Sequence, residues 1–373
     1  MRALAFLGIA LVIFAPFNVV TIRQLLRIHP HRRRWILAAA VIGNLMWPFF
    51  LVLRDLTPFS RMARAILGPP WFAWTSLAIL YTALMLLVLL AWIPFRKRRF
   101  AGFARWPSRI FLSLGLVGAV AGFYQALVPL RVERVPILLE NLPAEAEGMR
   151  IAVMSDLHVG LFTRPSRLEK IFTTARALDP DATVILGDMI DDDPHFVPKL
   201  LDGTAALGPD IPLLAVLGNH EIYGDPRQVI SGLRGSRIRL LVNEWVPLRS
   251  VTFAGLGEYG VSRTPEHRAL GPDVERALAG ASFPIVLSHQ PKAFYETRAK
   301  NVPLTIAGHT HGGQCGIRPL GLSLAGAFLE YHMGLYRYST SQLYINTGTG
   351  YWLVPFRLGM TPEITLIELR RAN

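Results

Sequence analysis

The sequence is poor in cysteine and, over its first third, in acidic residues. Cys315 is the only cysteine among 373 residues, which excludes an intramolecular disulfide and a cysteine-rich zinc site. Residues 1–129 contain fifteen Arg and Lys but one acid, Asp55, whereas residues 130–373 contain twenty-four basic and twenty-five acidic residues. The net charge of +13 therefore arises entirely in the N-terminal part.

Four apolar segments without a charged side chain fill this basic part. A helix of about 20 such residues crosses a hydrocarbon core roughly 30 Å thick, so the basic excess lies beside a bilayer and does not indicate nucleic-acid binding. We predict an all-α transmembrane domain over residues 1–129. A cleaved signal peptide is the alternative for the first segment, but no small-x-small cleavage site follows it. The predicted spans are residues 3–20, 35–53, 71–95 and 110–128.

The loops between these spans differ in charge. The first and third loops carry five and six basic residues, and the second carries three together with Asp55. The positive-inside rule places the first and third loops in the cytoplasm. Four crossings then put residues 130–373 outside, which predicts a multi-pass inner-membrane protein with an extracytoplasmic second domain.

The second domain, residues 130–373, contains five short apolar runs that each lead into polar residues. Continuous apolar runs of this length are typical of fully buried strands. Ligands gather at the carboxyl ends of such strands, so these polar side chains should converge. With further strands and a helix at residues 165–178 capped by Ser166, we expect a sheet-rich α/β fold. The runs are residues 151–154, 183–186, 213–217, 285–288 and 304–307, and the additional strands are residues 131–139, 251–256, 342–346 and 363–369.

The residues at these strand ends have the chemistry of metal ligands. Asp156 and His158 are two positions apart and share one face. Asp188 has two carboxylate oxygens and can bridge two cations, and imidazole nitrogens suit Zn, Fe or Mn better than Mg. The sequence therefore predicts a centre for two divalent ions, Mn, Zn or Fe. Cys315 lies near the last motif, either as a thiolate ligand or as a small packed side chain. The predicted ligands are Asp156, His158, Asp188, Asn219, His289, His309 and His311.

The order Asp-x-His, Gly-Asp, Gly-Asn-His-Glu, a lone His and Gly-His-x-His resembles the calcineurin-like metallophosphoesterases, in their bacterial membrane-anchored branch. The resemblance implies a four-layer double β-sandwich flanked by helices. It also implies that Asp188 bridges the two ions. The first ion would be held by Asp156, His158 and His311, and the second by Asn219, His289 and His309.

The resemblance further implies a hydrolase that cleaves a phosphomonoester, phosphodiester or pyrophosphate bond by attack of a metal-bridging hydroxide. His220 is the predicted catalytic residue, which would hydrogen-bond the phosphoryl group or protonate the leaving oxygen, and Glu221 could orient it. The acidic run at residues 191–193 is expected to be a solvated turn, with tuning of metal affinity as the alternative.

The substrate is expected to be a phosphorylated small molecule or a lipid. Apolar stretches around Arg318, Arg337 and Arg357 either bind the acyl chains and phosphate of a lipid or pack in the core. A rival hypothesis is a non-catalytic membrane sensor or transporter with a metal-binding outer domain. A binding module needs no general acid, and the predicted spans lack the ionisable residues of a transport path. The stretches are residues 322–328, 331–338 and 351–356.

Overall fold

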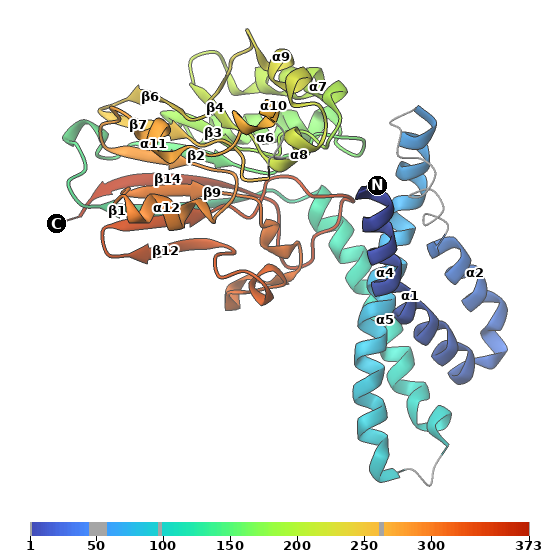
Figure 1. Ribbon diagram of the computed structural model, residues 1–373. Helices are drawn as coiled ribbons and strands as arrows, with labels where there is room; N and C mark the ends of the chain where they lie inside the picture. The colour runs from blue at the N-terminus through green and yellow to red at the C-terminus, as the bar shows by residue number, and fades with distance from the viewer. Residues whose placement is uncertain (1, 45–57, 96–98, 261–264, 373) are drawn as a thin grey trace. The chain divides into compact units, whose positions relative to one another are not determined.

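The computed structural model describes residues 2–44, 58–95, 99–260 and 265–372. The chain forms two compact units, residues 1–122 and residues 123–373. The first unit is helical and the second contains the β-sheets (Figure 1). The expected mixed α/β class of the second domain is confirmed by these sheets and helices.

The described part of the N-terminal unit is built from long helices. Two stretches are long and apolar enough to cross a membrane, Ile66–Phe95 with a mean hydropathy of 2.4 and Phe100–Leu127 with 1.8. They contain most of the third and fourth predicted spans. The first predicted span lies within α1, and the second begins in α2 and continues outside the described residues, so four crossings remain a prediction. The helices are α1 (Arg2–Ile28), α2 (Arg33–Asn44), α4 (Pro58–Trp92) and α5 (Phe100–Leu127).

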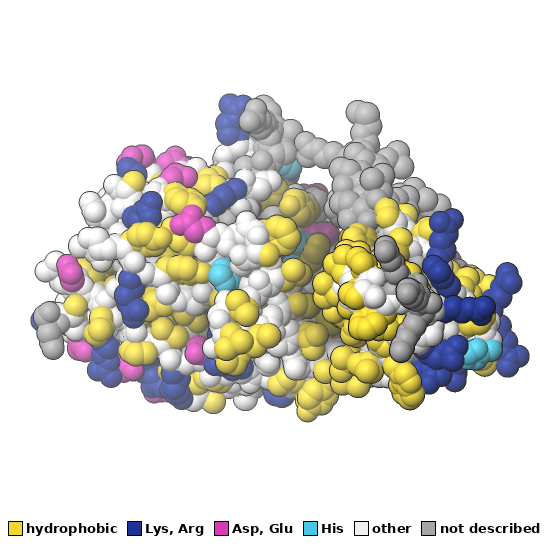
Figure 2. Space-filling model, turned by 90° about the horizontal axis from the view of Figure 1, so that it is seen from below, with side chains coloured by type: hydrophobic (Ala, Val, Ile, Leu, Met, Phe, Trp, Pro, Cys, Tyr) yellow, Lys and Arg dark blue, Asp and Glu magenta, His cyan; other side chains and the backbone are white. Residues whose placement is uncertain are grey.

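These helices expose apolar side chains and bury polar ones. Leu87 and Leu116 are more than 60% exposed, at 61% and 67%, whereas Thr21 and Ser108 are fully buried. Figure 2 shows one face of the molecule on which such apolar side chains gather. Several of the buried polar groups bond to one another, which offsets the cost of placing a polar group in an apolar environment. Tyr81 and Ser108, for example, share a hydrogen bond of 2.7 Å.

Two six-stranded sheets form the second unit. Three neighbouring strands of the first sheet, β2, β3 and β4, are parallel, as are β7, β8 and β9 of the second. The carboxyl ends of each parallel group therefore lie at one edge of its sheet. The first sheet has the order β1 (Arg131–Leu139), β14 (Glu363–Arg371), β2 (Arg150–Met154), β3 (Ala182–Leu186), β4 (Leu213–Val216) and β5 (Ile238–Leu240); the second has β12 (Gly334–Tyr338), β13 (Ser341–Ile345), β9 (Leu304–Ala307), β8 (Pro284–Leu287), β7 (Val251–Gly255) and β6 (Glu244–Leu248).

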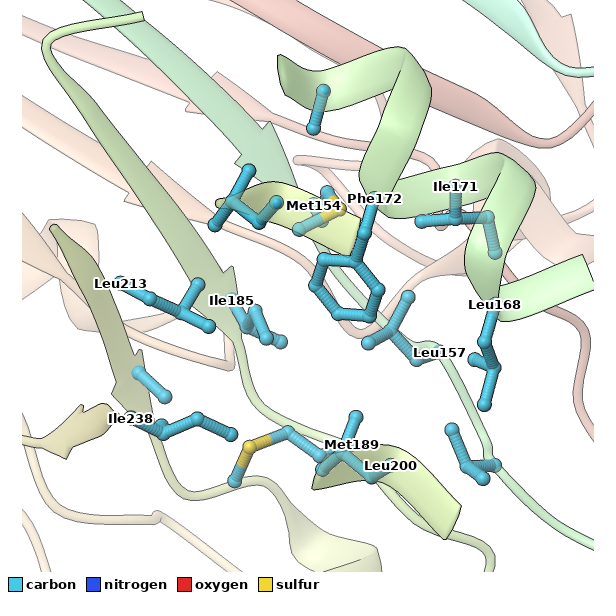
Figure 3. Close-up of a cluster of buried hydrophobic side chains, with 14 of the residues drawn as sticks. Met154, Leu157, Leu168, Ile171, Phe172, Ile185, Met189, Leu200, Leu213 and Ile238 are labelled. Carbon is cyan, nitrogen blue, oxygen red and sulfur yellow. The ribbon is translucent and has the colours of Figure 1, made fainter. Parts of the chain in front are cut away.

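Apolar clusters hold these elements together. One joins inward side chains of both sheets, such as Val153 and Ile306, so the sheets face each other across a shared core. A second packs the first sheet against α6 (Pro165–Ala177), α7 (Val197–Thr204) and α9 (Pro226–Leu233), with Phe172 fully buried among Met154, Leu157 and Ile185 (Figure 3). A third packs the second sheet against α11 (Val274–Leu278) and α12 (Ala293–Ala299).

The five apolar runs lie in strands β2, β3, β4, β8 and β9, within one residue of their predicted ends. Ser166, the predicted N-cap of α6, does not occupy that position. Arg164 occupies the N-cap of α6 without a side-chain hydrogen bond, and Pro165 is the first helical residue. Proline is well suited to this position because its ring fixes φ and the first helical residue needs no N–H partner.

Candidate metal centre

The backbone leaves each strand abruptly at the predicted ligands. Asp156, His158, Asp188, His309 and His311 all have positive φ, between 43° and 71°. This left-handed conformation is unfavourable for residues with a Cβ and is typical of functional sites. It turns side chains that follow different strands toward a common point.

Glycines allow the loops to approach one another at this point. A Cβ on Gly218 would lie 2.2 Å from Oδ1 of Asp188, and a Cβ on Gly308 would lie 1.8 Å from Oγ of Ser155. Both distances are too short for a side chain. The glycine before Asn219 and the glycine before His309 are therefore required by packing against the neighbouring ligand loops.

The first group of candidate ligands consists of Asp156, His158 and His311, which are buried and have ligand atoms within 4.8 Å of one another. Nε2 of His311 lies 3.2 Å from Oδ1 of Asp156 and 3.1 Å from Nε2 of His158. Two imidazole nitrogens and a carboxylate oxygen thus face the same small volume. This donor set suits a divalent transition metal.

The second group consists of Asp188, His289 and His309. Nε2 of His289 lies 3.2 Å from Oδ2 of Asp188, 3.0 Å from Nδ1 of His309 and 3.1 Å from Oδ1 of Asn219. The four side chains follow strands of both sheets. The centre therefore lies where the carboxyl ends of the two parallel groups meet.

Asp188 faces both groups. Its Oδ2 is 3.2 Å from Nε2 of His289 in the second group and 3.7 Å from Nε2 of His158 in the first. The seven predicted ligands are thus brought together, with one carboxylate between the two sets.

The protonation states of two histidines also fit a metal centre. Burial, together with the nearby His289, lowers the pKa of His309 to about 4. Burial likewise lowers the pKa of His311 to about 4, although Asp156 opposes the shift. Both imidazoles are therefore neutral at neutral pH, which is the form that binds metals. The donor set, and the neutral form of these two imidazoles, fit two divalent cations.

His220 lies beside the centre. Its backbone N–H donates to Oδ1 of Asp188 over 2.9 Å, and its Nδ1 lies 2.6 Å from Oδ1 of Asp192. Burial opposes protonation, but the hydrogen bond to Asp192 and the charges of Asp188 and Asp191 outweigh it and raise the pKa of His220 to about 9. The ring is thus an imidazolium at neutral pH, with Nε2 4.0 Å from Oδ2 of Asp188.

The structure corrects one expectation about the neighbours of His220 and adds to a second. Glu221 does not orient the ring; its carboxylate accepts hydrogen bonds from the backbone N–H groups of Gly218, Asp188 and Ile190 at 2.7, 2.9 and 3.1 Å. Asp192 is not merely part of a solvated turn, because it is the partner of Nδ1. The acidic run was the available signal, but three consecutive aspartates do not show which one contacts His220.

Asp191 forms a third cluster with His158 and His220 that has ligand atoms within 4.8 Å of one another. Its Oδ1 is 3.8 Å from Nδ1 of His158 and 3.7 Å from Nδ1 of His220. Cys315 belongs to none of the three clusters found among the described residues. Burial raises the pKa of its thiol, which disfavours a thiolate ligand.

Two of the arginines expected near the substrate are already engaged. Arg357 is fully buried and donates to the carbonyl oxygens of Gly350 and Thr347, both over 2.8 Å. Its Nη2 also lies 3.0 Å from Nδ1 of His311. Arg318 forms an ion pair of 2.5 Å with the buried Glu363. Arg357 therefore supports the loop that carries His311, and Arg318 supports the start of β14.

Comparisons with known proteins agree with this geometry. The family model described as calcineurin-like phosphoesterase matches residues 149–313. An uncharacterized metallophosphoesterase of Helicobacter pylori strain J99 is 30% identical over 287 residues, which cover 75% of this chain and 74% of that protein. A transmembrane protein with metallophosphoesterase domain from Danio rerio is 34% identical over 277 residues, 70% of this chain and 62% of that protein.

Among solved structures, a dimetal phosphatase from Danio rerio superimposes with a TM-score of 0.37 and 14% identity, covering 54% of this chain and 88% of that one. The sequence similarity to the bacterial protein extends over most of both chains. The family model spans the strand ends that carry the candidate ligands. The chain therefore belongs to the metallophosphoesterase family, whose members are metal-dependent phosphoesterases.

Proposed function

We propose that this protein hydrolyses a phosphomonoester, phosphodiester or pyrophosphate bond at a centre that holds two divalent ions. The observation that carries the proposal is the position of Asp188 between two ligand groups, with the His220 imidazolium beside it. When bound, two such cations lower the pKa of water and neutralise phosphoryl oxygens during in-line attack. Mn, Zn and Fe suit the donor set, which contains four imidazoles.

Side chains next to the two ligand groups would supply the proton and hold the loops in place. Asp192 holds Nδ1 of His220, which leaves Nε2 directed toward the centre. From this position the imidazolium can protonate the oxygen of the leaving group, which is general acid catalysis. Glu221 fixes the loops that carry Asp188 and Gly218 through its three backbone hydrogen bonds.

An assay of the purified full-length protein tests this proposal. The protein is stripped of metal with a chelator, reconstituted with Mn, Zn or Fe, and assayed on an aryl phosphomonoester, a bis-aryl phosphodiester and a nucleoside-diphosphate lipid. We expect turnover that disappears on stripping and returns with metal. Metal binding without turnover of any substrate would support the alternative of a non-catalytic membrane sensor or transporter.

The N-terminal part is proposed to anchor the protein as four membrane spans, and the second domain to form a four-layer sandwich outside the cytoplasm. The two apolar stretches of α4 and α5 and the basic first and third loops support the membrane proposal. A fusion of alkaline phosphatase after Val128 should be active in intact cells, and a fusion of green fluorescent protein at the same point should be dark. The reverse pattern would place the domain in the cytoplasm.

A lipid-linked substrate is the proposed substrate class. The support comes from the region expected to bind acyl chains, where Leu322, Leu324 and Phe328 are 57%, 54% and 82% exposed. These side chains are available for contact with lipid. A direct comparison of kcat/KM on the lipid and on its water-soluble head group tests this class.

A further inference from the structure

An exposed apolar hairpin follows the metal-binding loop. We define the apolar hairpin as residues 316–329, in which β10 (Gly316–Ile317) and β11 (Leu322–Ser323) pair antiparallel. It contains no acidic residue, and its one basic residue, Arg318, is paired with Glu363. Exposed apolar surface of this kind marks a site of interaction. The exposed side chains are Ile317, Leu320, Leu322, Leu324, Phe328 and Leu329, at 44% to 82%.

The last turns of α5 contact residues 356–359, a segment that is hydrogen-bonded to the first residue of this hairpin. Residues 123–127 of α5 belong to the same compact unit as the sheets. The backbone N–H of Gly359 donates to Oε1 of Gln125 over 2.7 Å, and the ring of Phe123 meets that of Phe356 edge-on at 5.5 Å. Leu358, next to Gly359, accepts a 2.9 Å hydrogen bond from Gly316, the first residue of the hairpin.

These contacts place the hairpin at the level where α5 ends. Phe123 lies four residues before the end of the helix, or about 6 Å along its axis. Because α5 is long and apolar enough to cross a bilayer, its last turn should reach the membrane interface. The hairpin is bonded to the segment that contacts this turn, so it should lie near the same depth.

Basic side chains at the end of α5 also favour a membrane surface. Lys170 donates to the carbonyl oxygen of Val128 over 3.0 Å, and Arg167 donates to that of Pro129 over 3.2 Å. Cations at this level attract anionic lipid head groups. Apolar side chains next to such cations are typical of segments that lie in the bilayer interface.

We propose that the apolar hairpin inserts its exposed side chains into the lipid bilayer, as a second membrane contact beside α5. The hairpin packs directly on the metal loop, since a Cβ on Gly313 would lie 2.4 Å from the backbone nitrogen of Ala325. Insertion therefore holds the metal centre at the bilayer surface. This consequence, access of the centre to a phosphoester in a lipid head group, rests on the proposed function.

A site-specific fluorescence experiment tests the insertion without requiring turnover. In a Cys315→Ser background, Phe328→Cys is labelled with an environment-sensitive dye, and the full-length protein is placed in nanodiscs that contain spin-labelled lipid. Asp210→Cys is the control, because Asp210 is exposed and precedes β4, whose opposite end leads to the metal centre. A second variant, Leu320→Cys, guards against local disruption at Phe328.

We expect lipid spin labels to quench the dyes at residues 328 and 320 at least several-fold more than the dye at residue 210. Aqueous iodide should show the opposite order. Strong iodide quenching at residues 328 and 320 would show a hairpin in water and overturn the proposal. Protection from both quenchers would show that a protein surface, such as a second copy of the chain, covers the hairpin, and would also overturn it. Lipid quenching as expected in a protein that shows no phosphoesterase turnover would instead count against the proposed function alone.

Discussion

In the helical unit, Leu116 and Val117 are 67% and 65% exposed while Thr21 is fully buried, whereas in the sheet unit Val153 and Ile306 are fully buried. The helical unit thus exposes apolar side chains that the sheet unit would bury in its core. Water drives apolar surface inward in the sheet unit. Hydrocarbon exerts no such force on the helices, which instead pair their polar groups internally. The difference supports a lipid environment for the helical unit.

Buried polar groups also have different roles in the two units. In the helical unit several of them hydrogen-bond to one another, as Tyr81 and Ser108 do. In the sheet unit they converge, with nitrogen and oxygen lone pairs of seven side chains directed at one small volume. Buried polar groups that hydrogen-bond to each other stabilise the structure, whereas buried polar atoms that gather at one place indicate a bound ligand.

The largest effect is expected when Asp188, which faces both ligand groups, is replaced. Asp188→Asn should reduce bound metal from about two ions per chain and lower kcat/KM by more than about 10⁴-fold, beyond the contribution of a general acid. Metal analysis and kinetics of the purified variant measure both. Asn219→Ala, which alters only the second group, is the matched control and should lose less. Equal losses for the two variants would contradict a bridging role for Asp188.

Replacement of His220 separates a role in catalysis from a role in metal binding. His220→Ala should lower kcat by about 10² to 10⁴ on substrates with poor leaving groups, with metal content nearly unchanged. Activated aryl esters need less acid assistance, so their loss should be smaller. Asp192→Asn, which removes the charge that holds Nδ1, should show the same substrate pattern with a smaller loss. Loss of metal from His220→Ala would instead make His220 a ligand through the cluster with Asp191 and His158.

A core truncation tests the water-driven packing of the sheet unit. Phe172 is fully buried between α6 and the first sheet, so Phe172→Ala should lower the free energy of unfolding of this unit by about 3 to 5 kcal/mol. Urea unfolding of the full-length protein, followed by a probe in the sheet unit, measures the shift. Leu138→Ala, at a side chain that is 52% exposed, should change it by less than about 1 kcal/mol. A similar shift for both variants would remove the contrast between core and surface.

The smallest effect is expected for a polar pair in the helical unit. Tyr81→Phe removes the hydrogen bond with Ser108 and should cost about 0.6 kcal/mol, and at most about 1.7 kcal/mol. Unfolding of the protein in mixed micelles with increasing denaturing detergent provides the measurement. Tyr124→Phe, at a ring that is 59% exposed, is the control and should have no measurable effect. A cost of several kcal/mol at Tyr81 would show that polar pairs dominate the stability of these helices.

The sequence predicted the strand ends well because a buried parallel strand is a continuous apolar run, and its end is marked by the first polar residues. Asp156, Asp188 and His289 could be found in this way. The partner of His220 could not, since Asp191, Asp192 and Asp193 are chemically alike and only the turn of the chain selects Asp192. The role of Glu221 was also hidden, because its partners are backbone amides, which have no sequence signature.

The three backbone hydrogen bonds of Glu221 couple the loop after β3 to the loop after β4 through one carboxylate. Neither loop can open alone without leaving a fully buried carboxylate with fewer donors, which is costly. The two loops should therefore fluctuate as a single body. Their amide hydrogens should exchange with solvent together and slowly, which would keep the Asp188 carboxylate and the His220 ring at a constant separation.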